Sequence, residues 1–507
     1  YDEAGNLMQK IDANGQHLSY RYDALNRLIS IDAPGSDDDV SYTYDDCLNG
    51  SGRVCGVYRG ETAIAFIYTA FGEIAGSSQS VTSWPGIQQA DIGLSYRYDS
   101  IGRLASVSYP GGAVVNYRYD AAGQLSAVDL DQAGHRVSLL SEVTYLPFGP
   151  VSRQRYGNDV QIFGWHDEAY RPRVIGNAGV AYDVLDYDGN GNATSQLLQA
   201  GSHTYGYDAL NRLATGAGVF GSRDYMYDAN GNRTRDSSDG LKTNYTYTPA
   251  SNRLTGVGGE AVTVDANGNT TELRGLRLGY SADNRLRGVA GIADYAYNGL
   301  GQRVQKATRA SGSAGQYGFG PRRLFLYGRN GQLLVESGPT GQVTREYIYA
   351  NSMLLAILDH VPESANDPLF NADRDGDGAI SVEDFLEWYF NAYLMADDSL
   401  EVSGDGVMDA DDASTVWACA SVQNSCVVAS HRTSIHYVHN DHLGTPMALT
   451  DESGAKVWSA TYDPFGQATV NEDVDGNGEP VTLNICLLYT SDAADDRYKV
   501  WVGGGGG

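Results

Sequence analysis

The stretch "LSYRYDALNRLISI", residues 18–31, decides the fold of this chain because variants of it recur along the sequence. Apolar and polar residues alternate up to Tyr22, which is the pattern of a β-strand with one aromatic face. The carboxylate of Asp23 can accept a backbone N–H across a turn, and Asn26 tolerates the left-handed conformation that closes it. A second strand, 27–31, then returns, so the stretch predicts a β-hairpin.

Copies of this hairpin signal repeat at short intervals. The pattern recurs with glycine at the turn after Tyr98 and Tyr119, and tyrosines at 187, 207, 227 and 247 are spaced by twenty residues. An isolated hairpin is marginally stable in water, so the units must stack to bury their tyrosine faces. About 16 units precede residue 350, and two strands each predict a sheet roughly 150 Å long. Such a sheet must coil or close, because sheets twist and open edges invite aggregation.

Composition narrows the class of protein. The chain has 507 residues, 62 glycines and 36 tyrosines against 11 phenylalanines, a mixture that favours strands and tight turns. Its net charge of −28 argues against a nucleic-acid partner, since phosphates would be repelled. The longest aliphatic run, "MLLAIL" from Met353, is too short to span a bilayer. The sequence begins inside the repeat pattern, so we expect a fragment that lacks its natural start.

Four of the five cysteines form two local pairs. Cys47 and Cys55 flank a turn-rich stretch, and Cys419 and Cys426 form a second close pair. The spacing suggests two disulfides and an oxidising compartment, with four free thiols as the alternative.

The Tyr-Asp-x-x-Gly/Asn-x-Leu units resemble those of the YD-repeat, or Rhs, family. The stretch "YVHNDHLGTPMALTDESGAKVWSATYDPFG", residues 437–466, resembles the repeat-associated core region of that family. The resemblance implies that the hairpins wind into a hollow β-shell. It also implies a secreted or surface-exposed bacterial container that often encloses a toxic C-terminal segment of the same chain. Relatives serve in bacterial competition, in insecticidal toxin complexes and in animal cell adhesion.

The sequence departs from this family pattern at its end. The Asp-Pro-x-Gly-Leu motif, where some members cut themselves, is missing, and Asp463-Pro464 belongs to an earlier element. Self-cleavage and toxicity are therefore not implied for this fragment. The stretch "CLLYTSDAADD", from Cys486, looks like a translated sequencing-library adapter, and the chain ends in a run of glycines. We expect 486–507 to be a non-native tail; a flexible acidic tail is the alternative.

One island, "NADRDGDGAISVEDFLEWY" at 371–389, interrupts the repeats and fits an EF-hand-type calcium loop. Its oxygens are spaced to converge on one hard cation, and Asp at the twelfth position, in place of the usual glutamate, also resembles dockerin-like loops. An apolar helical pattern follows it. The expected ligands, in order, are Asp373, Asp375, Asp377, Ala379 through its carbonyl, Ser381 and Asp384.

A second and weaker loop follows the predicted helix. It begins with glutamate and has serine at its third position, so one strong ligand is lost. The expected ligands are Glu401, Ser403, Asp405, Val407 through its carbonyl, Asp409 and Asp412. We therefore predict that residues 359–430 are a small α-helical, Ca²⁺-binding EF-hand- or dockerin-like module inserted between two strands. An acidic disordered linker is the alternative.

Catalytic patterns are not recognisable in the sequence. His436, His439, Asp441 and His442 lie close together and suggest a metal, but the resemblance favours a structural role for them. We find no Ser/His/Asp, Cys/His or paired-carboxylate arrangement and no phosphate-binding loop, so we predict no enzymatic activity.

The predicted organisation has four parts: a mainly β hairpin array at 1–358, the calcium module at 359–430, a truncated core region at 431–485 and the tail at 486–507. The predicted function is a structural shell or scaffold of a secreted or surface Rhs-type protein. An adhesion or glycan-binding repeat protein is the alternative, and a self-processing toxin precursor is a third reading of the full-length protein. Expected partners are a missing C-terminal effector segment and a cell-surface or glycan partner. Nucleic acid and a membrane span are not expected in this fragment.

Overall fold

The computed structural model describes residues 1–82, 89–177, 179–249, 251–309, 319–339, 341–362, 431–476 and 480–483. Within these residues the protein is nearly all β. Thirty-seven strands form one sheet, each strand pairs antiparallel with the next along the chain, and a single 3₁₀ turn, η1 (Ser36–Asp38), interrupts them. The mainly β prediction is confirmed. Of the predicted helical insertion at 359–430, residues 359–362 belong to strand β33 and the rest lies outside the described residues.

The strands of the first half are β1 (Gln9–Ile11), β2 (His17–Tyr22), β3 (Leu28–Asp32), β4 (Val40–Tyr44), β5 (Val54–Arg59), β6 (Thr62–Tyr68), β7 (Ile74–Thr82), β8 (Gln89–Tyr98), β9 (Leu104–Ser108), β10 (Val114–Tyr119), β11 (Leu125–Gln132), β12 (His135–Tyr145), β13 (Val151–Tyr156), β14 (Gln161–His166), β15 (Pro172–Asn177), β16 (Ala181–Tyr187), β17 (Ala193–Leu198), β18 (Gly201–Tyr207) and β19 (Leu213–Gly218).

The remaining strands are β20 (Gly221–Tyr227), β21 (Arg233–Ser238), β22 (Leu241–Tyr247), β23 (Leu254–Val257), β24 (Glu260–Val264), β25 (Thr270–Leu273), β26 (Leu276–Tyr280), β27 (Leu286–Val289), β28 (Ala293–Tyr297), β29 (Arg303–Arg309), β30 (Phe319–Tyr327), β31 (Leu333–Ser337), β32 (Val343–Ala350), β33 (Met353–Pro362), β34 (His431–Asn440), β35 (Pro446–Thr450), β36 (Lys456–Tyr462) and β37 (Ala468–Asn471).

The predicted hairpin forms as expected at residues 17–32. The Asp23 carboxylate accepts the backbone N–H of Leu25 and of Arg27, each at 2.9 Å, and Asn26 has a φ of 60°. Arg27 closes the turn instead of starting the return strand, because its N–H is taken by Asp23. Before residue 350 the structure has β1 to β32, which matches the predicted 16 hairpins.

In many hairpins a tyrosine hydroxyl ties the hairpin to the one before it. The hydroxyl of Tyr227 donates to the carbonyl of Leu213 at 2.7 Å, and the Arg212 guanidinium lies over the Tyr227 ring, 4.7 Å from its centre. Arg212 in turn donates to Asp208, the turn residue of its own hairpin, at 2.7 Å. The Tyr-Asp pair therefore links the turn of one hairpin to the strand of the next. Equivalent tyrosine-to-carbonyl bonds are made by Tyr44, Tyr68, Tyr98, Tyr119, Tyr145, Tyr187, Tyr207, Tyr247, Tyr327 and Tyr462.

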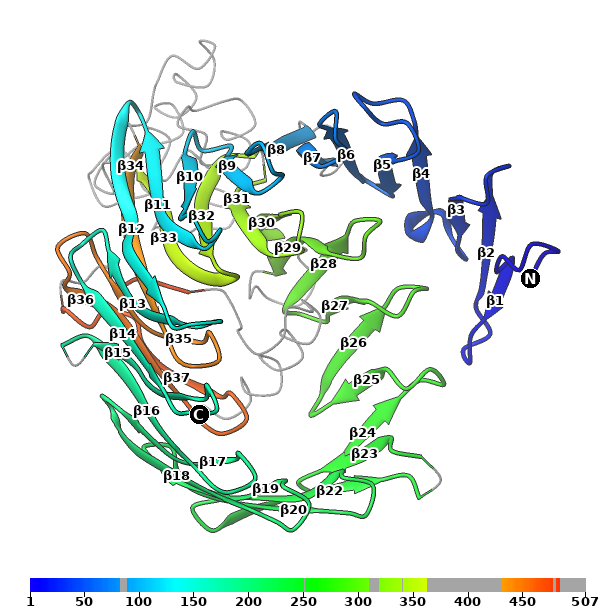
Figure 1. Ribbon diagram of the computed structural model, residues 1–507. Helices are drawn as coiled ribbons and strands as arrows, with labels where there is room; N and C mark the ends of the chain where they lie inside the picture. Colours follow the sequence, from blue (N-terminus) through cyan, green and yellow to red (C-terminus); the bar gives the residue numbers. More distant parts are fainter. Residues whose placement is uncertain are drawn as a thin grey trace, which may run out of the picture.

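The sheet coils and meets itself after about half of the chain (Figure 1). We call β1–β23 the first winding and β24–β37 the second winding. Hydrogen bonds join the two windings. The residue numbers of the two partners increase in parallel from one bond to the next, as they must when a sheet winds over itself. These pairs are Asn14 with Asp265, Arg59 with Asp283, Gln79 with Phe325, Tyr109 with Tyr347, and Tyr156 with Val438.

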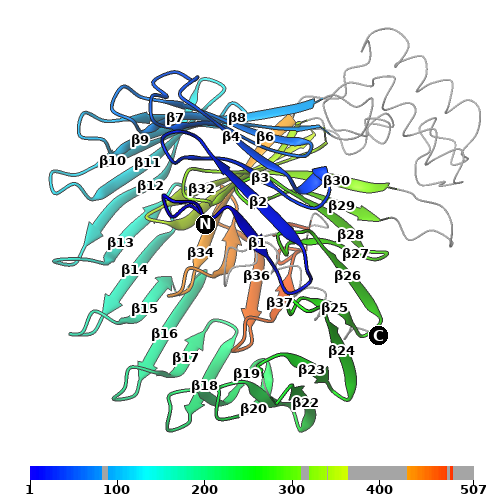
Figure 2. The ribbon, with the colours of Figure 1, turned by 90° about the vertical axis from the view of Figure 1, so that its right-hand side faces the viewer.

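The two windings form a double layer around the largest apolar cluster. That cluster combines buried side chains of β8–β14, such as Val115 and Leu139, with side chains of β31–β34, such as Ile348 and Leu358. Figure 1 shows β28–β33 inside the arc of the first winding, and Figure 2 shows the same strands from the side. The core therefore lies between two stacked sheets.

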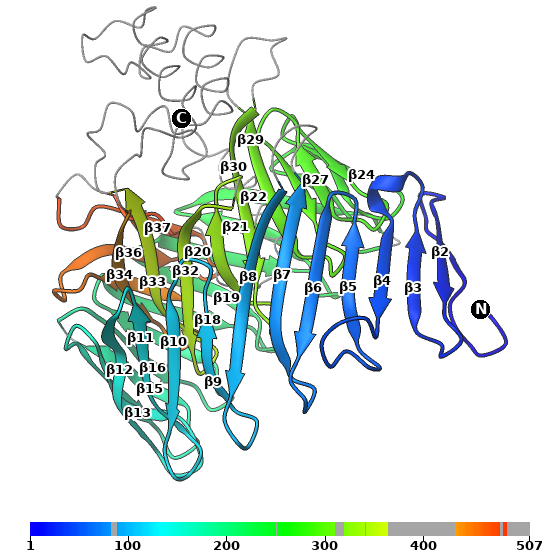
Figure 3. The same cartoon turned by 90° about the horizontal axis from the view of Figure 1, so that it is seen from above.

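The strands end along two rims of the coiled sheet, and the connections between strands differ from one rim to the other. Between strands, the Tyr-Asp turn motifs all follow even-numbered strands, so we call the rim formed by these turns the Tyr-Asp edge. Residues 83–88, 310–318 and 363–430 all connect an odd-numbered strand to the next one and therefore depart from the opposite edge. The view from above separates the row of Tyr-Asp turns from that edge (Figure 3).

We predict that Tyr227→Phe lowers the free energy of unfolding by about 1 kcal/mol, the net worth of one hydrogen bond. The ring and its contact with Arg212 remain, so the loss isolates the hydroxyl bond to Leu213. Chemical unfolding measures the total, and hydrogen exchange should show the opening localised to β19–β21. Tyr1→Phe, in an exposed tyrosine, is the control, and an equal effect there would contradict the hydroxyl ladder.

Candidate functional site: the seam between the two windings

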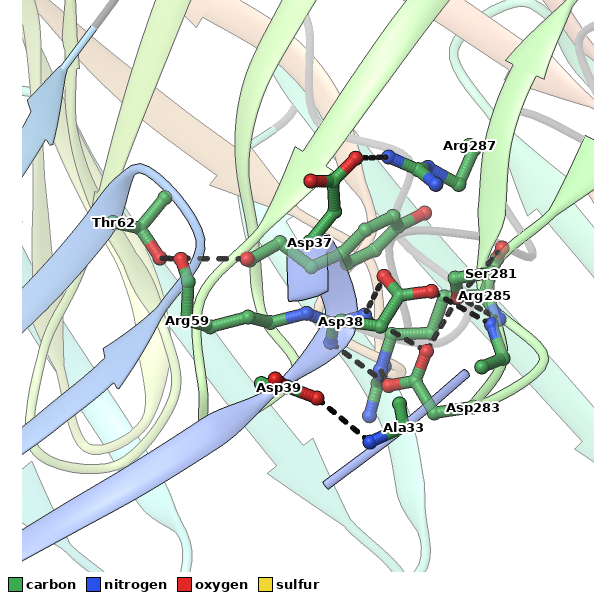
Figure 4. Close-up of polar contacts among 12 residues, drawn as sticks. Ala33, Asp37, Asp38, Asp39, Arg59, Thr62, Ser281, Asp283, Arg285 and Arg287 are labelled. Carbon is green, nitrogen blue, oxygen red and sulfur yellow. Dashed lines mark hydrogen bonds and ion pairs between the residues drawn. The ribbon is translucent and has the colours of Figure 1, made fainter. Parts of the chain in front are cut away.

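A buried arginine joins the two windings. Arg59, at the end of β5, is only 5% exposed. Its two terminal nitrogens bind both oxygens of Asp283 in the second winding at 2.8 and 2.9 Å, and one of them also binds Asp38 in the first winding at 3.0 Å (Figure 4). Two parallel charge-assisted bonds of this kind are among the strongest in proteins. The arrangement clamps the second winding onto the first.

The local sequence explains why Asp283 is available for this clamp. In the turn between β26 and β27 the usual Tyr-Asp aspartate is replaced by Ser281, whose hydroxyl accepts the N–H of Arg285 at 3.0 Å. The turn is closed by Ser281, and Asp283, which stands where other hairpins have Leu25 or Leu210, faces the first winding. The N–H of Ala282 also donates to Asp38 at 2.9 Å. An aspartate in place of that turn leucine is the signal that could have revealed this site.

Charge compensation stabilises the clamp. Burial raises the pKa of Asp283, but hydrogen bonds from Arg59 and Ser281 outweigh it, so the pKa is below its usual value. Burial lowers the pKa of Arg59, and its bonds with Asp283 and Asp38 more than restore it. At the rim of the cluster Arg287 lies 3.4 Å from Asp37. Both partners of the Arg59–Asp283 pair are held in their charged forms, so the seam is an ionic contact built around a buried guanidinium.

The histidines singled out from the sequence go to separate partners. His436 Nδ1 lies 3.1 Å from Asp359, His439 Nε2 lies 2.8 Å from the Thr450 hydroxyl, and His442 Nδ1 lies 2.7 Å from Asp183 of the first winding. The Asp441 carboxylate accepts the N–H groups of Leu443 and Thr445, which is the role of the aspartate in a Tyr-Asp turn. The structure therefore does not bring these four residues together around one point.

Buried charges also surround the strands that flank the predicted insertion. Arg345 binds Asp359 on β33. Glu346 is fully buried and accepts the N–H of Gly111, in the first winding, at 2.7 Å. His360 lies 3.2 Å from the second Glu346 oxygen. These contacts fix the base of the insertion to the double layer.

Of the remaining predicted site residues, some are described by the structure and the others are not. Cys47 and Cys55 form a disulfide. The expected calcium ligands, from Asp373 to Asp412, and the pair Cys419 and Cys426 lie outside the described residues. In the described part of the chain no three His, Cys, Asp or Glu side chains gather as a metal site. No helix of that part has the length and apolar character to cross a membrane.

The seam makes Arg59 a sensitive position. We predict that Arg59→Ala lowers the free energy of unfolding by about 1.5–3 kcal/mol, because it removes a buried guanidinium and its charge-assisted hydrogen bonds to Asp283 and Asp38. Chemical unfolding measures the loss. Arg21→Ala, in an ion pair whose arginine is 70% exposed, should change little. Equal effects of the two variants would contradict a buried clamp.

The His442–Asp183 pair predicts a pH dependence. Burial lowers the pKa of His442, but Asp183 and Asp441 raise it above its ordinary value. The pair therefore stabilises fully below about pH 6.5, the unfolded value, and this contribution is lost as the pH rises through the higher folded pKa. The stability difference between the parent protein and His442→Gln should shrink with rising pH.

His439 provides the opposite control. Burial lowers its pKa to about 3, so the folded protein favours its neutral form and loses stability as the pH falls below about 6.5. The difference between the parent protein and His439→Gln should therefore change with pH in the opposite sense. Thermal unfolding between pH 5 and 9 measures both differences, and parallel slopes would contradict the assignment.

Comparison with known proteins agrees with the repeat pattern. The family model described as RHS Repeat matches residues 1–38 and 98–133, and the one described as RHS protein matches residues 435–472. A curated relative is Double-stranded DNA deaminase toxin A of Burkholderia cenocepacia (strain H111), which is 26% identical over 355 residues. The match covers 66% of this chain and 21% of that protein.

Solved structures share the fold. The crystal structure of TcdB2-TccC3 has a TM-score of 0.65 at 17% identity, covering 92% of this chain and 24% of that one. A Photorhabdus luminescens Tc holotoxin pore has a TM-score of 0.64 at 18% identity, covering 92% of this chain and 23% of that one. The chain thus spans about a fifth of the curated relative and about a quarter of the solved chains.

At these low sequence identities, the similarity to the solved structures is evidence about the fold alone. The matches to the RHS Repeat and RHS protein models, over separate parts of the chain, agree with the resemblance of the repeats and of the core region to the Rhs, or YD-repeat, family.

Proposed function

We propose that this chain is part of the wall of a hollow shell, in a secreted Rhs-type toxin-related protein, and that the shell encloses a C-terminal segment of the longer protein. The coil of hairpins, closed on itself by the seam, carries this proposal. The role is structural rather than enzymatic. The Cys47–Cys55 disulfide supports a secreted location, because disulfides persist in oxidising compartments. The alternative of an adhesion or glycan-binding protein stays a prediction.

The course of the chain after β37 supports enclosure. Side chains on β32 alternate in direction: Ile348 faces the first winding, whereas Tyr347 belongs to an apolar cluster on the other face of the sheet. Because the second winding lies inside the first, that other face is the concave one (Figure 1). Val481 and Leu483 pack on this cluster, and Arg345 donates to the carbonyl of Thr482 at 2.5 Å. Residues 481–483, the last ones described, therefore lie along the concave face.

We also propose that the segment between β33 and β34 binds Ca²⁺ through the two predicted loops. The two strands pair directly up to Pro362 with His431. The ends of the segment are therefore adjacent, as in a module inserted into a surface connection, where added length costs little closure entropy. The carboxylates between Asp373 and Asp384 supply, at the spacing of a calcium loop, the hard oxygen ligands that Ca²⁺ prefers.

Protease protection tests enclosure. In the longer natural protein, a cleavage site for a specific protease is introduced directly after Leu483, and in a second version between Asn230 and Gly231, at an exposed turn. We expect the turn site to be cut and the site after Leu483 to be protected until the shell is unfolded. Equal cleavage of both sites in the folded protein would contradict enclosure.

Calcium binding is tested on the whole chain by calorimetry and thermal unfolding with and without Ca²⁺. We expect saturable binding that Asp373→Asn with Asp375→Asn abolishes, because the first loop then loses two carboxylates. The matched control is Asp473→Asn with Asp475→Asn in the acidic stretch "DVDGNGEP" at 473–480. Loss of binding only in the control, or no binding in the parent protein, would contradict the proposal.

A further inference from the structure

A cavity of about 240 Å³ opens between the two windings at the Tyr-Asp edge. We call it the tyrosine slot. Tyr96, Tyr117 and Tyr119 line it from β8 and β10 of the first winding, and Tyr349 of β32 lines it from the second. Its apolar floor includes Leu334. The slot goes beyond the proposed shell function, which requires no cavity here.

One buried hydroxyl in the slot is left without a hydrogen bond. Tyr96 is 5% exposed, its hydroxyl makes no hydrogen bond of ordinary geometry, and its nearest polar neighbours are Ser77 and the backbone of Arg329. Leaving a buried hydroxyl unpaired costs free energy. The neighbouring hydroxyls of Tyr117 and Tyr119 donate to carbonyls at 3.1 and 2.8 Å, so each keeps an acceptor lone pair. The slot therefore offers one unused donor and several acceptors.

The mouth of the slot is polar and open to solvent. It is formed by the turn after β30, with Asn330 and Gln332, and by the turn after β32, with Asn351 and Ser352. Asn330, Asn351 and Ser352 are exposed. Their amide and hydroxyl groups both donate and accept hydrogen bonds. A ligand can therefore enter from the edge and be held by polar groups at the mouth and rings below.

The slot carries little charge. Arg329 is the one charged residue among those that line it, and its guanidinium is engaged with Tyr98, donating to the hydroxyl at 3.3 Å and lying over the ring. Tyr98 is neutral, so Arg329 leaves one positive charge at the mouth, which disfavours a cationic ligand, while the rest of the lining is uncharged. A neutral ligand with hydroxyl groups and apolar faces matches the lining.

We propose that the tyrosine slot binds one neutral hexopyranose ring. The apolar C–H faces of such a ring pack on aromatic side chains, and its hydroxyls pair with amides and with the Tyr96 hydroxyl. The cavity is below the range of about 300–1,000 Å³ typical of drug-sized ligands, so it suits a single ring rather than a chain of sugars. With so few atoms bound, the affinity is in the millimolar range.

The test uses the whole chain and three probes: methyl β-D-glucopyranoside, methyl β-D-galactopyranoside and N-acetyl-D-glucosamine. Saturation-transfer NMR detects contact, and a titration measures the dissociation constant. We expect at least one probe to bind, and Asn330→Ala and Tyr96→Phe each to weaken it about fivefold or more, a loss of one hydrogen bond in magnitude.

Matched controls come from the repeat itself. Asn230 occupies the place of Asn330 in another turn, and Tyr20 occupies the place of Tyr96 in another strand. Asn230→Ala and Tyr20→Phe should leave binding unchanged, and thermal unfolding verifies that every variant folds. The proposal is overturned if no probe binds at about 50 mM, well above a millimolar constant. It is also overturned if the controls weaken binding as much as the slot variants do.

Discussion

The hydrogen bond from a tyrosine hydroxyl to the preceding hairpin is the interaction on which the whole structure depends. A two-stranded hairpin is unstable alone, and this bond, with the arginine stacked on the tyrosine ring, gives each hairpin a defined neighbour. In the preceding hairpin, Asp208 closes the turn and holds that arginine, Arg212. One short motif thereby specifies the turn, the strand register and the stacking direction.

Coiling follows from repetition, but closure needs residues that break the repeat. A twisted sheet of 37 strands must curve. An identical repeat, however, does not determine at which residues one winding contacts the next. Asp283 and Arg59 supply that position because Asp283 stands where other hairpins have a leucine in the turn. Buried pairs such as His442 with Asp183 add further points of contact. The positions that define the shell are therefore those where the motif is altered.

The sequence predicted the hairpins well because each is encoded locally. The alternation up to Tyr22, the turn aspartate and the left-handed Asn26 all depend on neighbours a few residues away. The seam was not predicted, since its partners lie 224 residues apart and no local period relates them. The histidine cluster shows the same limit: His436 and His442 are close in sequence, but strand geometry sends them to Asp359 and Asp183. The calcium loops rest on spacing alone and stay a prediction.

The central claim is that the ribbon of hairpins coils upon itself instead of extending. Small-angle X-ray scattering of the chain in solution tests it most directly. A coiled double layer predicts a radius of gyration of about 25–30 Å, slightly above the value for a compact chain of this length. An open ribbon of 37 strands at about 4.8 Å each would be roughly 180 Å long and give about 50 Å. A value near the second figure would contradict the account.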